Sequence, residues 1–111
     1  MSTERRAQKR YVIDGLMVEL DGDLHETVEL SVRACAVVRK SNVNYTQLDG
    51  KGRFVCAKVP SLNRPMRNWR HLYAREAIVV IDYVVADDGW EAVLAAHDVR
   101  ADVSKLEDVL G

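Results

Sequence analysis

The sequence has no long apolar run, and this absence excludes a protein anchored by transmembrane helices. None of its hydrophobic stretches approaches the roughly 20 residues that a membrane-spanning helix needs. The first residues, Met-Ser-Thr-Glu-Arg-Arg, contain no apolar segment like the core of a secretory signal. We therefore expect a cytoplasmic protein that does not insert into a membrane.

An excess of charge of one sign is also missing. The chain of 111 residues carries 16 Lys and Arg against 17 Asp and Glu, a formal net charge of −1 at pH 7. A protein with this balance has no overall basic field to attract long nucleic acid. Any anionic ligand must therefore meet a local patch of cations.

Cysteine and histidine are scarce and scattered. Cys35 and Cys56 lie within apolar runs, where cytosolic cysteines are usually reduced core residues rather than disulfides. His25, His71 and His97 are isolated in the sequence, and we expect each at the surface or partly buried. Without a C-x-x-C pair or clustered ligands, the sequence predicts no metal site and no cofactor.

Motifs of catalysis are absent too. The Gly-rich stretch Asp49-Gly50-Lys51-Gly52 does not fit a Walker phosphate loop, and no nucleophile elbow or Cys–His motif occurs. The sequence therefore predicts no catalytic residues, and we expect a protein that is not an enzyme.

The residues that are present predict a mainly β domain. Hydrophobic residues make up 48% of the chain, enough for the core of one domain. Leu16, Val18 and Leu20 alternate as in a strand, and Asp21-Gly22-Asp23 is typical of a hairpin turn. Further strands are predicted over 24–30, 34–38, 53–59 and 76–86, with a loop over 41–52. We expect a small antiparallel β-barrel over residues 11–111, with a short C-terminal helix over 102–110 and a flexible basic leader over 1–10.

Two segments leave alternatives open. Residues 61–75 mix arginines with aromatics, which suits stacking and phosphate contact with single-stranded nucleic acid. The apolar residues of this segment lie at helical spacing, which favours a short amphipathic helix packed on the barrel: Met66, Trp69, Leu72 and Tyr73. Residues 90–99 fit either a strand or a helix, and the turn Asp87-Asp88-Gly89 before them favours a returning strand.

The leader carries a cluster of cations. Arg5, Arg6, Lys9 and Arg10 precede Tyr11. A guanidinium group is planar and always charged, and it can bind two oxygens of a phosphate, bind a guanine edge or stack on a base. A spacing of four residues lets Arg6 and Arg10 reach one ligand, although basic termini are often only solvated tails.

A second motif downstream connects the leader with a known family. Arg6-Ala7-Gln8-Lys9-Arg10 fits R-x-x-x-R, and Glu29-Leu30-Ser31-Val32-Arg33-Ala34 lies where a D/N-x-S-x-x-G turn would follow. With these motifs the chain resembles the PilZ family of bacterial cyclic di-GMP receptors, best from about residue 5 to residue 38. The resemblance implies a β-barrel effector that binds this second messenger and signals to a protein partner, with motility or surface attachment as the regulated process.

The resemblance also implies roles for individual residues. Arg6 and Arg10 would bind the phosphates and the guanine faces, and Glu29 and Ser31 would bind a guanine edge or a phosphate. The other residues assigned to the site are Arg5, Arg33, Ala34 and Trp69. Arg33 would be auxiliary. Trp69 lies beyond the resemblance and is a candidate for stacking on guanine because arginines flank it in the sequence. The leader would be mobile without ligand and would fold across the nucleotide.

The second motif departs from the family pattern at two positions. Glu29 replaces Asp or Asn, and its carboxylate can still accept hydrogen bonds from guanine with one more methylene to order. Ala34 replaces Gly. Glycine is used where the backbone needs a positive φ or where a ligand approaches closely. These changes favour an alternative, a degenerate PilZ-like scaffold that binds no nucleotide and acts by protein–protein contact. A third hypothesis, a single-strand nucleic-acid binder, rests on residues 61–75.

Overall fold

The protein is a mainly β structure, as predicted. The computed structural model describes residues 9–47, 50–86 and 89–99, so Arg5, Arg6 and the predicted helix over 102–110 lie outside the described residues. Within the described ranges, seven strands form one antiparallel sheet: β1 (Met17–Leu20), β2 (Asp23–Leu30), β3 (Ala34–Val38), β4 (Gly52–Val55), β5 (Arg64–Met66), β6 (Asn68–Ala74) and β7 (Ile78–Val84). The described residues also form two 3-10 turns, η1 (Tyr45–Gln47) and η2 (Pro60–Leu62), and one helix, α2 (Trp90–Ala96).

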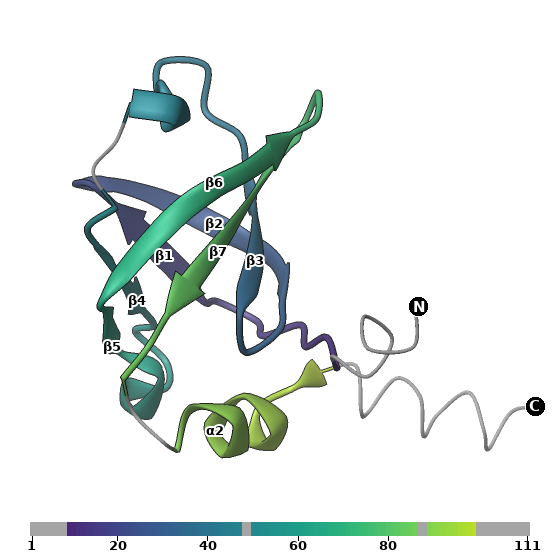
Figure 1. The fold of residues 1–111 in the computed structure, drawn as a ribbon. Coiled ribbons are helices and arrows are strands. Elements are labelled where there is room, and N and C mark those ends of the chain that lie inside the picture. The colour runs from purple at the N-terminus through teal and green to yellow at the C-terminus, as the bar shows by residue number, and fades with distance from the viewer. Residues whose placement is uncertain (1–8, 48–49, 87–88, 100–111) are drawn as a thin grey trace, which may run out of the picture.

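The sheet curls strongly but is not closed. Its strand order is β5-β4-β1-β2-β3-β7-β6, and in Figure 1 β6 and β7 cross in front of β1, β2 and β3. The edge strands β5 and β6 follow one another through a bend at Arg67. They pair with β4 and β7 respectively, and within the described residues they do not pair with each other. The chain at this bend joins the two edges, but no ladder of hydrogen bonds runs between them. The closed barrel that the sequence predicted is therefore not shown.

The core follows from strand alternation on the inner face of the sheet. Val18 and Leu20 of β1 are completely buried, as are Val79 and Ile81 of β7. Helix α2 packs near η2 at one end of the sheet (Figure 1) and places Trp90 against the ring of Phe54, with the ring centres 4.8 Å apart. This apolar packing holds the site described below on a rigid support.

β4 is shorter than the strand predicted over 53–59. It ends at Val55, because the next backbone N–H, that of Cys56, donates to Oδ1 of Asn63 at 2.6 Å. Cys56 and Cys35 are both buried free thiols, which confirms their prediction as core residues.

The helix predicted within 61–75 is wrong. This segment forms η2, β5 and β6, and strand pairing on both sides of the Arg67 bend overrides the helical spacing of its apolar residues. Met66 and Trp69 are buried, one from each strand, whereas Leu72 and Tyr73 are 45% and 47% exposed.

The returning strand predicted over 90–99 is also wrong, because Trp90–Ala96 is helix α2. β7 is already paired with β3 on one side and β6 on the other, so no edge remains for another strand. The segment Trp-Glu-Ala-Val-Leu-Ala-Ala has high helix propensity. Its two buried residues, Trp90 and Leu94, lie four apart on one face.

His25 is more buried than predicted, with 1% of its surface exposed. Its Nδ1 lies 2.8 Å from the carbonyl oxygen of Asp23. A carbonyl only accepts hydrogen bonds, so Nδ1 carries the proton and Nε2 accepts from the hydroxyl of Tyr45 at 2.8 Å. Burial lowers the pKa of His25, which keeps the ring neutral.

Among the helices of the described ranges, none has the length and apolar character that crossing a membrane requires.

Candidate functional site

The turn between β2 and β3 is organised by Ser31. Its Oγ accepts hydrogen bonds from the backbone N–H groups of Arg33 and Ala34, at 3.3 and 3.1 Å. Its own backbone N–H donates to the carbonyl of Ala34 at 2.8 Å. A serine that bonds to the backbone two and three residues ahead is a common way to fix a tight turn. The hydroxyl of Ser31 therefore shapes the turn in this structure.

The same turn is tied to the core by Tyr83. The hydroxyl of Tyr83 donates to the carbonyl oxygen of Ser31 at 2.5 Å and accepts from Nε1–H of Trp90 at 2.8 Å. Burial raises the pKa of Tyr83, so its hydroxyl stays protonated and keeps donating. A chain of hydrogen bonds thus runs from α2 through β7 to the Ser31 turn, which gives the turn a defined position.

Arg10 is brought to this turn by the backbone that follows it. Tyr11 and Leu30 form an isolated antiparallel bridge, with N···O distances of 2.7 and 2.9 Å. Val12 is held from the other side, because its N–H donates to Oδ1 of Asp98 at 2.9 Å and its carbonyl accepts from Val99 at 2.8 Å. The chain leaving the leader is therefore fixed between the end of β2 and the segment after α2.

The guanidinium group of Arg10 contacts the carboxylate of Glu29, with Nη1 and Oε2 3.2 Å apart. The Arg10 side chain is 64% exposed and that of Glu29 27%. Exposed pairs of this kind contribute about 0–1 kcal/mol to stability. Arg10 is therefore positioned without being strongly bound, and its charge remains accessible to a ligand.

A hollow of about 120 Å³ opens beside this pair, and we call it the leader–turn site. Arg10, Glu29, Ser31 and Ala34 line it, four of the residues that the sequence assigned to a ligand. Strand residues complete it: Leu30, Cys35, Ala36, Tyr73, Ile78 and Val80. The structure therefore gathers half of the predicted site residues around one depression, where cation, carboxylate and apolar surface adjoin.

Ala34, which stands where the family pattern has Gly, occupies ordinary backbone. It begins β3, and among the described residues other than glycine only Asp21 has a positive φ. An alanine at this position therefore causes no backbone strain. Its methyl group instead forms part of the lining of the hollow.

Two β-bulges set the rim of the leader–turn site. On β2 the register shifts between Thr27 and Glu29, and on β6 it shifts between His71 and Tyr73. A bulge inserts one residue and turns the following side chains to the other face. Glu29 and Tyr73 consequently lie on the outer face of the sheet and reach the hollow. Tyr73 was not predicted as a site residue because its segment was interpreted as a helix with Tyr73 packed on the barrel, and no pattern in the sequence indicates the bulge that exposes it.

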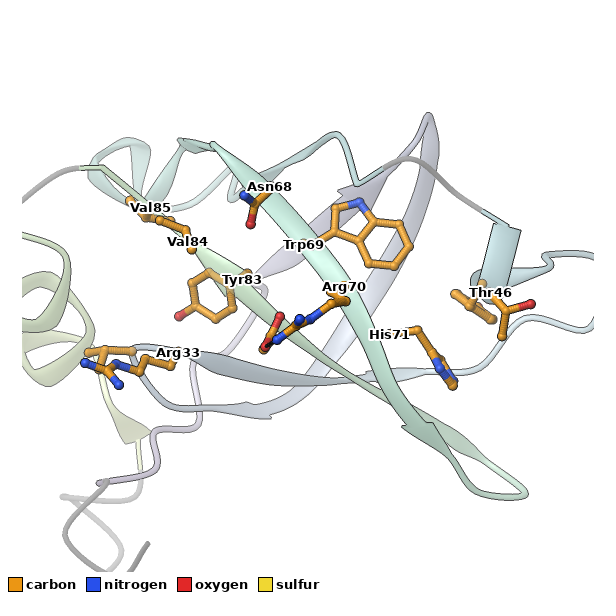
Figure 2. A pocket seen from close by; sticks show the side chains of 12 residues that line it. Arg33, Thr46, Asn68, Trp69, Arg70, His71, Tyr83, Val84 and Val85 are labelled. Atoms are coloured by element: carbon orange, nitrogen blue, oxygen red, sulfur yellow. Dashed lines mark hydrogen bonds and ion pairs between the residues drawn. The ribbon is translucent and has the colours of Figure 1, made fainter. Parts of the chain in front are cut away.

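Trp69 and Arg33 lie elsewhere. Both line a larger, open groove of about 1030 Å³, where Figure 2 shows Arg33 and Thr46 at opposite ends with β6 running between them. Trp69 is only 4% exposed, and its Nε1–H donates to the carbonyl of Lys51 at 2.8 Å. Its ring is part of the core and is covered on the side where a base would have to stack. Arg70 in the same groove is paired with Asp82 at 2.8 Å.

The described part of the chain contains no group of three or more His, Cys, Asp or Glu side chains that could hold a metal ion. Cys35 is 1% exposed, and burial raises the pKa of its thiol, which disfavours the thiolate form that reacts.

Comparisons with known proteins define the fold alone. No protein-family model matches the sequence, and no curated protein matches it. The structure is similar to the crystal structure of an uncharacterized protein of Legionella, with a TM-score of 0.54 and 14% sequence identity. The match covers 90% of this chain and 95% of that one.

Proposed function

We propose that this protein is a PilZ-like receptor that binds cyclic di-GMP at the leader–turn site and signals to a protein partner. The observation that carries the proposal is the contact between Arg10 and Glu29 beside the Ser31 turn. These residues are 19 positions apart in the sequence, one in each motif of the resemblance, and their side chains are in contact.

The groups around the hollow suit the chemistry of such a ligand. The exposed guanidinium of Arg10 can bind a phosphate through two parallel hydrogen bonds. The carboxylate of Glu29 can accept from the N–H groups of a guanine edge, as carboxylates do from base amino groups. The resemblance assigns the role of the second cation to Arg6, which lies four residues before Arg10 in the sequence.

Ligand binding would exchange one ion pair for two better interactions. The Arg10–Glu29 pair is exposed and costs about 0–1 kcal/mol to separate. Each new hydrogen bond to a charged partner is worth about 1.5–3 kcal/mol. Separating the pair therefore opposes only a small part of what such contacts contribute, so both of its ends can become binding groups.

Calorimetric titration with cyclic di-GMP tests the proposal. We expect the wild type to bind and Arg10→Ala to bind about 10- to 100-fold more weakly, since one charge-assisted contact is lost. Arg53→Ala is a matched control. Arg53 contacts Glu19 at 3.0 Å with side-chain exposures of 61% and 32%, close to those of the Arg10 pair but outside the leader–turn site.

Equal binding by the wild type and Arg10→Ala would contradict the proposal. No binding by the wild type would contradict it too. If the double variant Glu29→Asp, Ala34→Gly then gained binding, the domain would be the degenerate scaffold that acts only by protein contact.

A further inference from the structure

The outer face of the sheet carries a row of side chains that crosses four strands at the leader–turn site. Glu29 of β2 pairs with Ala36 of β3, Ala36 pairs with Val80 of β7, and Val80 pairs with Tyr73 of β6. Directly paired residues project from the same face. Three strand spacings separate the ends of the row, about 14 Å. The row thus joins a carboxylate to an aromatic ring across a short apolar floor.

The floor is low because its centre is built from small residues. Ala36 lies between Glu29 and Val80, and Ala34 lies two residues before it on β3. Larger groups stand on both sides, Arg10 and Glu29 at one end and Tyr73 at the other. An apolar floor between a polar wall and an aromatic wall matches a flat heteroaromatic ring with a polar edge.

Tyr73 is available for such a ring. It is 47% exposed although it is a large aromatic residue, and the bulge on β6 turns it toward the hollow. The guanidinium carbon of Arg75 lies 5.5 Å from the centre of its ring, a cation–π geometry. The aromatic end of the row therefore carries a cation of its own, opposite Arg10.

We infer that Tyr73 is the stacking residue of the leader–turn site and that, with Arg75, it binds a guanine base of the dinucleotide while Glu29 faces a guanine edge. This inference rests on the proposed function, and it assigns to Tyr73 the role that the sequence suggested for Trp69. Stacking on an aromatic side chain tolerates any base, so discrimination in favour of guanine falls to Glu29.

Titration of Tyr73→Ala and Tyr73→Phe with cyclic di-GMP tests the assignment. Loss of the aromatic ring should weaken binding about 5- to 100-fold, the range that alanine substitution of base-stacking aromatics produces. Tyr73→Phe should bind within about threefold of the wild type, because the ring remains. Val84→Ala is the matched control, since Val84 is an equally exposed residue at the end of the neighbouring strand β7 and does not line the hollow.

Each outcome separates the inference from the proposed function. If the wild type binds and Tyr73→Ala binds equally well, Tyr73 is not the stacking residue and the receptor proposal stands. If Val84→Ala loses as much affinity as Tyr73→Ala, the effect comes from the sheet as a whole and the assignment fails. If the wild type does not bind cyclic di-GMP, both fail. Thermal melting of each variant identifies any loss of affinity that is caused by unfolding. If Tyr73→Ala is unfolded, the comparison of Tyr73→Phe with the wild type decides instead. A loss of affinity of more than tenfold for Tyr73→Phe then contradicts the assignment.

Discussion

Removing the hydroxyl of Tyr83 should destabilise the protein far more than the loss of one oxygen atom suggests. This hydroxyl has two buried partners, the carbonyl of Ser31 and Nε1–H of Trp90. A buried polar group that loses its partner costs about 1–3 kcal/mol. Tyr83→Phe breaks both hydrogen bonds at once, so we expect the free energy of unfolding to fall by about 2–4 kcal/mol.

Urea denaturation followed by circular dichroism measures this change. With a dependence of about 2 kcal/mol per molar urea, the midpoint should fall by about 1–2 M. Tyr11→Phe makes the same chemical change at another buried ring. Its hydroxyl has a single long contact, 3.5 Å to the Glu91 carboxylate, so we expect a loss below about 1 kcal/mol. A loss below about 0.5 kcal/mol for Tyr83→Phe would refute the view that this hydrogen-bond chain fixes the turn.

Other properties of the fold can be tested in the same way. Burial lowers the pKa of His25, Lys40 lowers it further, and the backbone of Asp23 opposes both. Because the unfolded chain binds a proton near pH 6.5 more readily than the folded one, stability should fall as the pH drops below about 6.5 and level off below the folded pKa. The difference in unfolding free energy between wild type and His25→Gln should therefore shrink from pH 7.5 to pH 5; a constant difference would contradict this. Gly50→Ala should lower the free energy of unfolding clearly more than Gly22→Ala. Both glycines have a positive φ, but of the two only Gly50 would place the new Cβ against a backbone oxygen, that of Trp69 at 2.6 Å. Gly22→Ala should cost about 1–2 kcal/mol from backbone strain alone, and equal midpoints in thermal melting would be the contrary result.

Local signals in the sequence were sufficient for most of the strands. The alternation of Val18 and Leu20, the Gly22 turn, and the Val- and Ile-rich run of β7 depend on neighbouring residues only, and they predicted strands that the structure has. The Ser31 turn is equally local, because its serine bonds to residues two and three positions ahead. Such features need no knowledge of the rest of the fold.

Tertiary structure decided what local patterns left open. The segment from residue 90 became α2 because both edges of β7 were occupied, and β6 formed where helical spacing suggested a helix because β7 offered a partner. The bulges on β2 and β6 turned Glu29 and Tyr73 to the outer face, which no period in the sequence indicates.

The sequence by itself therefore determined most of the strands and the position of the Ser31 turn, and it suggested Arg10 and Glu29 as the cation and carboxylate of a binding site. Only the fold determined which aromatic ring stands beside them, by burying Trp69 and exposing Tyr73. The physical reason is that strand propensity is a property of adjacent residues, whereas the register of a sheet depends on pairing between segments distant in the chain.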